Sequence, residues 1–160
     1  IEQPHRHIDE SLKSNILKGG YWLKKPGPNP QLVIVYQGVI ANEVIEAASI
    51  LGERFKDIGV LSITSSDNLF HDWKNKSSNL HTHKEQSHIE VLLDYISKDT
   101  KLITVIDGHP MTLSWIGSVY GHKTITLGVD RFGQTGNIKE LFSEFGIDSS
   151  SISNLGFKMN

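Results

Sequence analysis

The segment GVDRFGQT, which begins at Gly128, has the residue types and spacing of a phosphate-binding loop with one substitution. In the pattern G-x-x-x-x-G-K-[ST], backbone N–H groups and the lysine side chain bind phosphate. Gly128, Gly133 and Thr135 occupy the fixed positions, but Gln134 stands where the lysine should be. Asp130 adds a negative charge that would repel phosphate. We therefore interpret the segment as a glycine-containing turn between a strand and a helix.

Three histidines, His81, His83 and His88, lie close together in HTHKEQSH. Two histidines separated by one residue on a strand point to the same side and can share a metal ion. Here the pair lies in a polar stretch, and no further histidine or carboxylate at metal-site spacing completes a ligand set. The sequence therefore predicts a solvated loop without a metal site.

Nucleophile candidates lack partners at a useful spacing. Ser62, Ser65 and Ser66 lie in or just after an apolar run, without the G-x-S-x-G pattern. Asp107 and His109 are close in IDGHP, but no serine completes a set with them. His109 has two open interpretations: it lines a pocket, or it lies in a turn where its ring bonds to the backbone. We find no complete catalytic set.

The segments that position these residues alternate between apolar runs and helical patterns. The predicted buried strands are QLVIVY (31–36), GVLSI (59–63), LITVI (102–106) and TITL (124–127). Apolar residues recur with helical spacing from Ile40 to Phe55 and from Ile89 to Ile96. A third helix is predicted after Pro110, and a fourth over 138–145. The fourth begins with Asn137 and Glu140 as a capping pair and stops at Gly146.

This alternation predicts a parallel sheet that helices cover on both faces. GYWLKK, residues 20–25, would add an antiparallel edge strand through the turn PGPNP. We expect a three-layer α/β/α fold with a mostly parallel sheet of about five strands. Residues 1–160 are expected to form one domain, with 1–15 as an irregular lead-in and 16–150 as the folded body.

A polar rim is expected where the strands end. In open parallel sheets, ligands bind beyond the carboxyl ends of the strands. The residues predicted at this rim are Ser65, Ser66, Asp107, His109, Asp130 and Arg131. Such a rim can bind a small molecule or another domain.

Composition excludes several classes of protein. Of 160 residues, 38% are hydrophobic and 21% charged, which is typical of a soluble globular protein. A net charge of -2 without blocks of like charge argues against nucleic acid or an anionic membrane as partner. LVIVY is too short an apolar run to span a membrane. The absence of cysteine excludes disulfides and Cys-based zinc sites, and fits a cytoplasmic location.

The chain begins with Ile1 rather than methionine, and its polar start lacks a signal-peptide pattern. We therefore expect a fragment of a longer polypeptide.

The segments LGVDRFGQTG and IKELFSEFGID resemble the end of the C-terminal domain of the transketolase family. Members of that family show G-[VI]-D-x-F-G-x-[ST] before a helix that ends in F-G-[IV]. ILKGGYWLKK and QLVIVYQGVIANEVIEAASIL look like the opening of the same domain. VLSITSSDNLFHDWKN is similar to a region of the homodimeric pyruvate dehydrogenase decarboxylase component, which is the closest resemblance. The family resemblance as a whole covers about residues 15–150.

The resemblance implies a three-domain enzyme that uses thiamine diphosphate and magnesium, with this domain contributing to a homodimer. The cofactor motif G-D-G…N-N is absent, so the chain alone is expected neither to bind the cofactor nor to catalyse. The resemblance gives Gly128 and Gly133 a structural role. It leaves Asp130 and Arg131 for turn hydrogen bonds or contacts to neighbouring domains.

The partners that the resemblance implies are the other domains of the same chain, a second copy and a dihydrolipoyl acyltransferase component. The alternative within the family is a transketolase. An alternative of another class is a free-standing regulatory domain that binds a small ligand at the rim.

Overall fold

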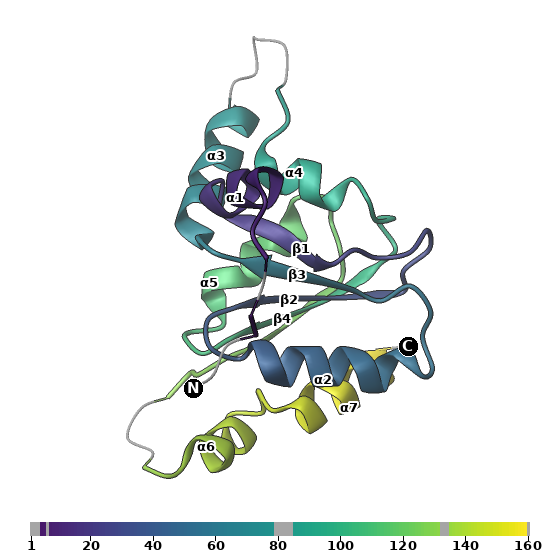
Figure 1. Ribbon diagram of the computed structural model, residues 1–160, viewed down its shortest axis with the longest axis vertical. Coiled ribbons are helices and arrows are strands. Elements are labelled where there is room, and N and C mark those ends of the chain that lie inside the picture. The colour runs from purple at the N-terminus through teal and green to yellow at the C-terminus, as the bar shows by residue number, and fades with distance from the viewer. Residues whose placement is uncertain (1–3, 6, 79–84, 132–134, 160) are drawn as a thin grey trace.

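The computed structural model describes residues 4–5, 7–78, 85–131 and 135–159 (Figure 1). Its strands are β1 (Gly20–Lys24), β2 (Leu32–Gln37), β3 (Gly59–Ile63), β4 (Lys101–Ile106) and β5 (Thr124–Leu127). Its helices are α1 (Glu10–Leu17), α2 (Ala41–Gly52), α3 (Ser66–Ser78), α4 (His88–Leu93), α5 (Met111–Ser114), the 3-10 helix η1 (Trp115–Ser118), α6 (Ile138–Glu144) and α7 (Ser149–Met159).

The strands form one five-stranded sheet in the order β1-β3-β2-β4-β5. Strands β3, β2, β4 and β5 are parallel, and β1 is an antiparallel edge strand, as predicted. The edge strand does not form a hairpin with β2 across the proline-rich turn. Tyr21 pairs with Ser62 of β3 instead. The reason is that β2 already has a parallel neighbour on each side, so β1 can join only at an edge of the sheet, and it does so beside β3.

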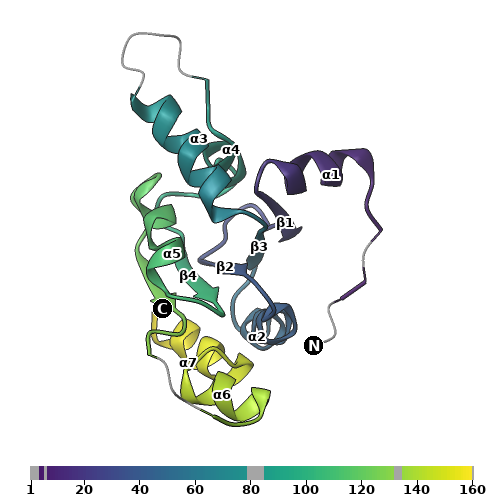
Figure 2. The ribbon, with the colours of Figure 1, turned by 90° about the vertical axis from the view of Figure 1, so that its left-hand side faces the viewer.

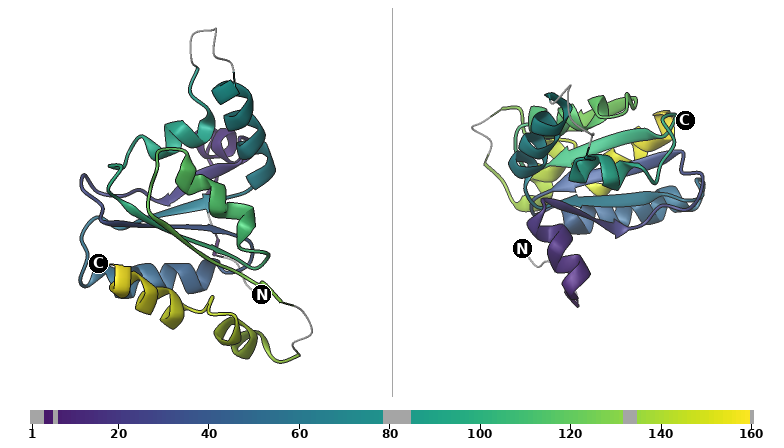
Figure 3. Two further views of the ribbon diagram at one scale, coloured as in Figure 1. Left: turned by 180° about the vertical axis from the view of Figure 1, so that it is seen from behind. Right: turned by 90° about the horizontal axis from the view of Figure 1, so that it is seen from above.

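Two helical layers cover the sheet (Figures 1 and 3). Helices α2, α6 and α7 lie on one face, and α3, α4 and α5 lie on the other. Successive residues of a strand point to opposite faces, so a strand that is covered on both sides is apolar throughout. In β2, Leu32 packs in the core under α2 and α7, whereas Val33 packs in the core under α4 and α5. The predicted three-layer α/β/α fold is confirmed.

Helix α1 forms within residues predicted to be irregular. Its N-cap, Asp9, accepts a hydrogen bond of 2.7 Å from the backbone N–H of Leu12. Leu12 and Ile16 are one helical turn apart and half-buried, so they give α1 one apolar side toward the domain. The polar composition of the lead-in hides this short pattern.

Two further helices differ from expectation. Helix α3 extends over 13 residues, where only a helical turn at NLFHDW was predicted. Helix α7 was not predicted, because its SSSIS start favours turns and caps in isolation. It forms against α2, where Gly156 allows close packing: a Cβ at Gly156 would lie 2.7 Å from Leu51 Cδ2.

The start and end of α6 match the sequence prediction. Asn137 Oδ1 accepts from the N–H of Glu140 at 3.0 Å, and Glu140 Oε2 accepts from the N–H of Asn137 at 3.2 Å. Gly146, with φ of 65°, follows the helix. None of the helices in the described ranges is long and apolar enough to cross a membrane.

Candidate functional site

The predicted rim begins where β2 and β4 end. Asp107, directly after β4, accepts a hydrogen bond of 3.3 Å at Oδ2 from the backbone N–H of Val39, which follows β2. Gly38 has φ of 95°, and a Cβ there would lie 1.8 Å from Asp107 Oδ1. Only glycine fits this position, because it needs both a left-handed backbone and close approach to a carboxylate. The Asp107 side chain thus joins two strand ends.

The end of β5 packs against the same region. The N–H of Val129 donates to the carbonyl of Gly108 at 2.8 Å. A Cβ at Gly128 would lie 2.5 Å from that carbonyl oxygen, so this glycine is required for close contact between two loops. Gly133 and Gln134 lie outside the described residues.

Helix α6 differs from the helix of a phosphate-binding loop. In that motif the helix N-terminus binds the phosphate. Here α6 begins at Ile138, and the Glu140 carboxylate already occupies its first turn through the capping box. A phosphate at this position would be repelled by the Glu140 carboxylate.

The remaining rim residues contact their own chain. Nδ1 of His109 accepts a hydrogen bond of 3.3 Å from the backbone N–H of Met111. This matches the interpretation of His109 as a turn residue whose ring bonds to the backbone. Arg131 Nη2 lies 2.5 Å from Glu144 Oε1, and its guanidinium lies 5.8 Å from the centre of the Phe145 ring. Asp130 is exposed beside it.

Ser65 and Ser66 form a separate part of the rim near β1. The Ser65 N–H donates to the carbonyl of Gly19 at 3.1 Å, and its hydroxyl accepts from the N–H of Asn68 at 3.3 Å, at the start of α3. Ser66 is buried. No serine of the described rim bonds a histidine or a carboxylate, so the geometry offers turn and cap contacts rather than an activated nucleophile.

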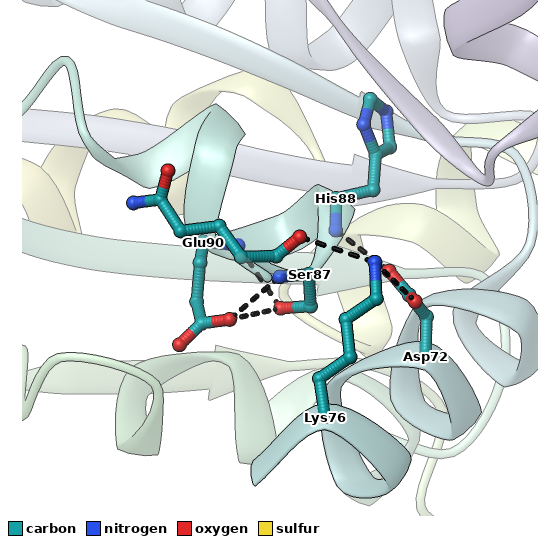
Figure 4. Close-up of polar contacts among 6 residues, drawn as sticks. Asp72, Lys76, Ser87, His88 and Glu90 are labelled. Atoms are coloured by element: carbon teal, nitrogen blue, oxygen red, sulfur yellow. Dashed lines mark hydrogen bonds and ion pairs between the residues drawn. The ribbon is translucent and has the colours of Figure 1, made fainter. Parts of the chain in front are cut away.

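A polar cluster that the sequence did not predict lies between α3 and α4 (Figure 4). The N–H of His88 donates to Asp72 Oδ2 at 2.7 Å. Lys76 Nζ lies 3.1 Å from Asp72 Oδ1 and donates to the carbonyl of Gln86 at 3.1 Å. Ser87 and Glu90 complete a capping box at the start of α4. These hydrogen bonds join α3 to the start of α4.

His88 also reaches the edge strand. Its Nε2 lies 2.8 Å from the carbonyl oxygen of Gly20, and a carbonyl only accepts, so Nε2 carries the hydrogen. Burial lowers the pKa of His88 below its ordinary value; the nearby Lys18 and Lys76 act in the same direction, while the Gly20 hydrogen bond and Asp72 oppose them. His88 is therefore neutral near pH 7.

The structure separates His88 from the loop in which it was predicted to lie. His88 is the first residue of α4, whereas His81 and His83 lie outside the described residues. Within the described ranges, no group of three or more histidines and acidic side chains could hold a metal ion. A sequence signal for the position of His88 was available: SHIE carries the serine-to-glutamate spacing of a capping box just before an apolar helix.

Comparison with known families identifies the domain. A family model described as the transketolase-like TK C-terminal domain matches residues 19–148. The chain belongs to this family. The transketolase C-terminal fold explains the five-stranded mixed sheet and the order of its elements, from β1 to α6.

The relatives are transketolases of much greater length. "Transketolase 2" of Aliivibrio fischeri is 29% identical over 147 residues, which are 91% of this chain and 20% of the relative. This chain therefore spans about a fifth of that relative.

Solved structures show the same fold. Transketolase from Campylobacter jejuni matches with a TM-score of 0.62 and 20% identity, over 88% of this chain and 18% of that chain. A Pichia stipitis transketolase in complex with xylulose 5-phosphate matches with a TM-score of 0.61 and 22% identity, over 91% and 18%. A split-gene transketolase described as an inactive beta4 tetramer matches with a TM-score of 0.57 and 18% identity, over 86% and 39%.

Proposed function

We propose that this chain is the C-terminal assembly domain of a transketolase and is not catalytic by itself. The observation that carries the proposal is the family match over residues 19–148. The names of the matched proteins favour a transketolase over the pyruvate dehydrogenase component that the sequence resemblance suggested first. The TSSDNLFHDW region (64–73), which supported that first interpretation, forms the loop after β3 and the first part of α3, and so belongs to the shared fold.

The rim is the side from which the rest of the enzyme would contact this domain. Exposed Val39 and Met111 flank Asp107 and His109 there, so apolar and polar groups are mixed as in interfaces between domains. Pro4 and His5 line a hollow of about 410 Å³ together with Tyr36 and Ala41, at the junction of β2 and α2. Any domain joined ahead of residue 4 would thus be connected close to this end of the sheet.

Thiamine diphosphate and magnesium would bind elsewhere in the complete enzyme. The rim does not fit a diphosphate–magnesium site: Asp107 already bonds Val39, and the exposed Asp130 adds negative charge without a described carboxylate cluster. The contribution of this domain is to pack and orient the others, within one chain and across a homodimer.

The test uses the complete enzyme that contains this domain and, separately, the 160-residue chain. The complete enzyme should consume xylulose 5-phosphate, the sugar bound in the Pichia stipitis structure, and should not decarboxylate pyruvate. Calorimetry should show thiamine diphosphate binding to the complete enzyme and none to the isolated chain. Turnover of pyruvate alone would restore the dehydrogenase alternative, and micromolar cofactor binding by the isolated chain would overturn the assembly role.

A further inference from the structure

An apolar hollow lies between helix α2 and the edge strand β1. Its volume is about 360 Å³, and its lining residues are Leu23, Lys24, Ile45, Ala48, Ser49 and Val60. Figure 2 shows α2 beneath β2 and β3, with β1 beyond β3 at the edge of the sheet. This β1–α2 hollow has the size and the mostly apolar lining that are typical of pockets for small molecules.

The wall on the side of α2 follows from helical spacing. Ile45, Ala48 and Ser49 are three and four residues apart, so they lie on one side of the helix. Ala48 is 3% exposed and Val60 of β3 is 1% exposed, whereas Ile45 is 40% exposed. The hollow therefore has a buried apolar floor and a large apolar side chain at its mouth.

The wall on the side of β1 depends on an irregularity in the strand. Trp22 pairs with Leu61 and Lys24 pairs with Val60, so Leu23 is an extra residue between these pairs. Consecutive residues of a regular strand point to opposite faces, and a bulge interrupts this alternation. Leu23 and Lys24 accordingly line the same hollow. The bulge thus places an apolar side chain and a cationic one side by side.

The charge in the hollow is positive and uncompensated. Within the described residues, the Lys24 ammonium forms no ion pair, and no acidic side chain lines the hollow. Ser49 adds a hydroxyl that can donate a hydrogen bond. Apolar walls with one cation and one hydroxyl are complementary to a molecule that has an apolar body and a single anionic group.

We propose that the β1–α2 hollow binds a small monocarboxylate with an apolar tail, such as a medium-chain fatty acid. The tail packs against Leu23, Ile45 and Val60. The carboxylate accepts hydrogen bonds from the Lys24 ammonium and the Ser49 hydroxyl. This site lies apart from the rim and does not depend on the proposed function.

A protein surface fits the hollow less well than a small molecule does. Among its lining residues, all of which the structure describes, Ile45 alone is a large apolar side chain with an exposed surface. A stable protein interface buries about 800 Å² on each partner. The hollow also lies beside the starts of the parallel strands, whereas Pro4 and the rim lie at their other end.

Amide NMR of the 160-residue chain during titration with octanoate would locate and measure the binding. The signals of Lys24, Ala48 and Ser49 should shift and saturate, with a dissociation constant of about 1 mM or lower. Circular dichroism checks that the chain and each variant are folded. Shifts that gather on another surface, or no saturation up to about 10 mM octanoate, would overturn the proposal.

Lys24→Gln tests recognition of the carboxylate. It should weaken octanoate binding about threefold or more, because the ion pair is lost, and should leave the binding of uncharged octanol unchanged. Lys25→Gln is the matched control, since the Lys25 ammonium lies 5.3 Å from the centre of the Tyr95 ring, outside the hollow. Equal effects of the two substitutions on octanoate binding would contradict the proposal.

Ile45→Glu tests the location of the tail. It removes part of the apolar wall and adds a negative charge at the mouth, so octanoate should bind about tenfold more weakly or worse. Ile138→Glu is the control on α6, where Ile138 is 48% exposed, and it should leave the binding unchanged. An unaltered affinity in Ile45→Glu would exclude the hollow as the site.

The complete enzyme decides whether the hollow stays accessible. Equilibrium dialysis should give it an octanoate affinity within about threefold of that of the isolated chain, and Lys24→Gln should weaken binding there too. Binding by the isolated chain alone would show that another domain covers the hollow, and would overturn the proposal. Such a result leaves the proposed assembly role intact, because cofactor binding and the assay with xylulose 5-phosphate test that role.

Discussion

At the scale of single residues, the close approach of the Asp107 carboxylate to Gly38 leaves no room for a side chain at position 38. Gly38 combines a left-handed backbone with direct contact to the Asp107 carboxylate. The contact links loops 68 residues apart, as measured between Val39 and Asp107. The left-handed backbone and the close carboxylate together make Gly38 a position of the rim that does not tolerate a side chain without strain.

Gly38→Ala should lower the free energy of unfolding by about 1–3 kcal/mol, because the methyl group adds backbone strain and displaces Asp107. Urea unfolding of the isolated chain measures this change. Gly52→Ala is the control: no atom lies within 4 Å of the place that the added methyl group would take at the end of α2, so stability should stay equal or rise. Equal effects of the two substitutions would contradict the role of Gly38.

His88 should make the domain less stable in mild acid. Its pKa in the folded chain is lowered, mainly by burial, whereas the unfolded chain titrates near the ordinary 6.5. Above pH 6.5 neither state binds the proton, so the stability is complete. As the pH falls below 6.5 the unfolded state binds the proton first, and stability is lost until the pH passes the folded pKa.

Unfolding measured from pH 8 to pH 5 checks this dependence. His88→Gln should flatten it, because glutamine is neutral throughout and its amide can donate to the Gly20 carbonyl. His71→Gln, on the exposed side of α3, removes a histidine outside the cluster and should retain the loss in acid. An unchanged profile in His88→Gln would show that other groups cause the dependence.

At the scale of elements, short helices depend on their caps. Helix α6 has seven residues, none of them buried, and its capping box satisfies backbone groups at its start. Asn137→Ala should therefore lower the free energy of unfolding by about 1 kcal/mol. Asn154→Ala, at an exposed position within α7, should have little effect or a slightly favourable one. A neutral Asn137→Ala would show that packing alone holds α6.

At the scale of the whole molecule, Arg131 distinguishes a domain interface from a surface ion pair. In the isolated chain its bond to Glu144 is half-exposed, so Arg131→Ala should cost at most about 1 kcal/mol. In the complete enzyme, packing of other domains against the rim would bury this pair and enlarge the loss in stability or assembly. Comparing the same substitution in both proteins by thermal unfolding and sedimentation measures the difference. Equal losses would place the interface elsewhere.

The positions of the rim residues followed from the sequence, but their function did not. Asp107, His109 and Asp130 were predicted at strand ends because apolar runs ended just before them, and the structure places them there. The contacts of Asp107 with Gly38 and of Arg131 with Glu144 were not predictable. The first depends on which strands become neighbours in the sheet, and the second depends on how α6 folds back toward the end of β5.

The sequence by itself determined the parallel strands, the caps of α6 and the family, because each of these depends on local periodicity or on short ordered motifs. Tertiary structure decided the pairing of β1 with β3, the formation of α7 against α2, and the hydrogen bond between His88 and Gly20. The physical reason is that these features join segments far apart in the chain. A local pattern can predict a strand or a helix, but it does not say which distant segment will pack against it, and burial of each against the other stabilises both.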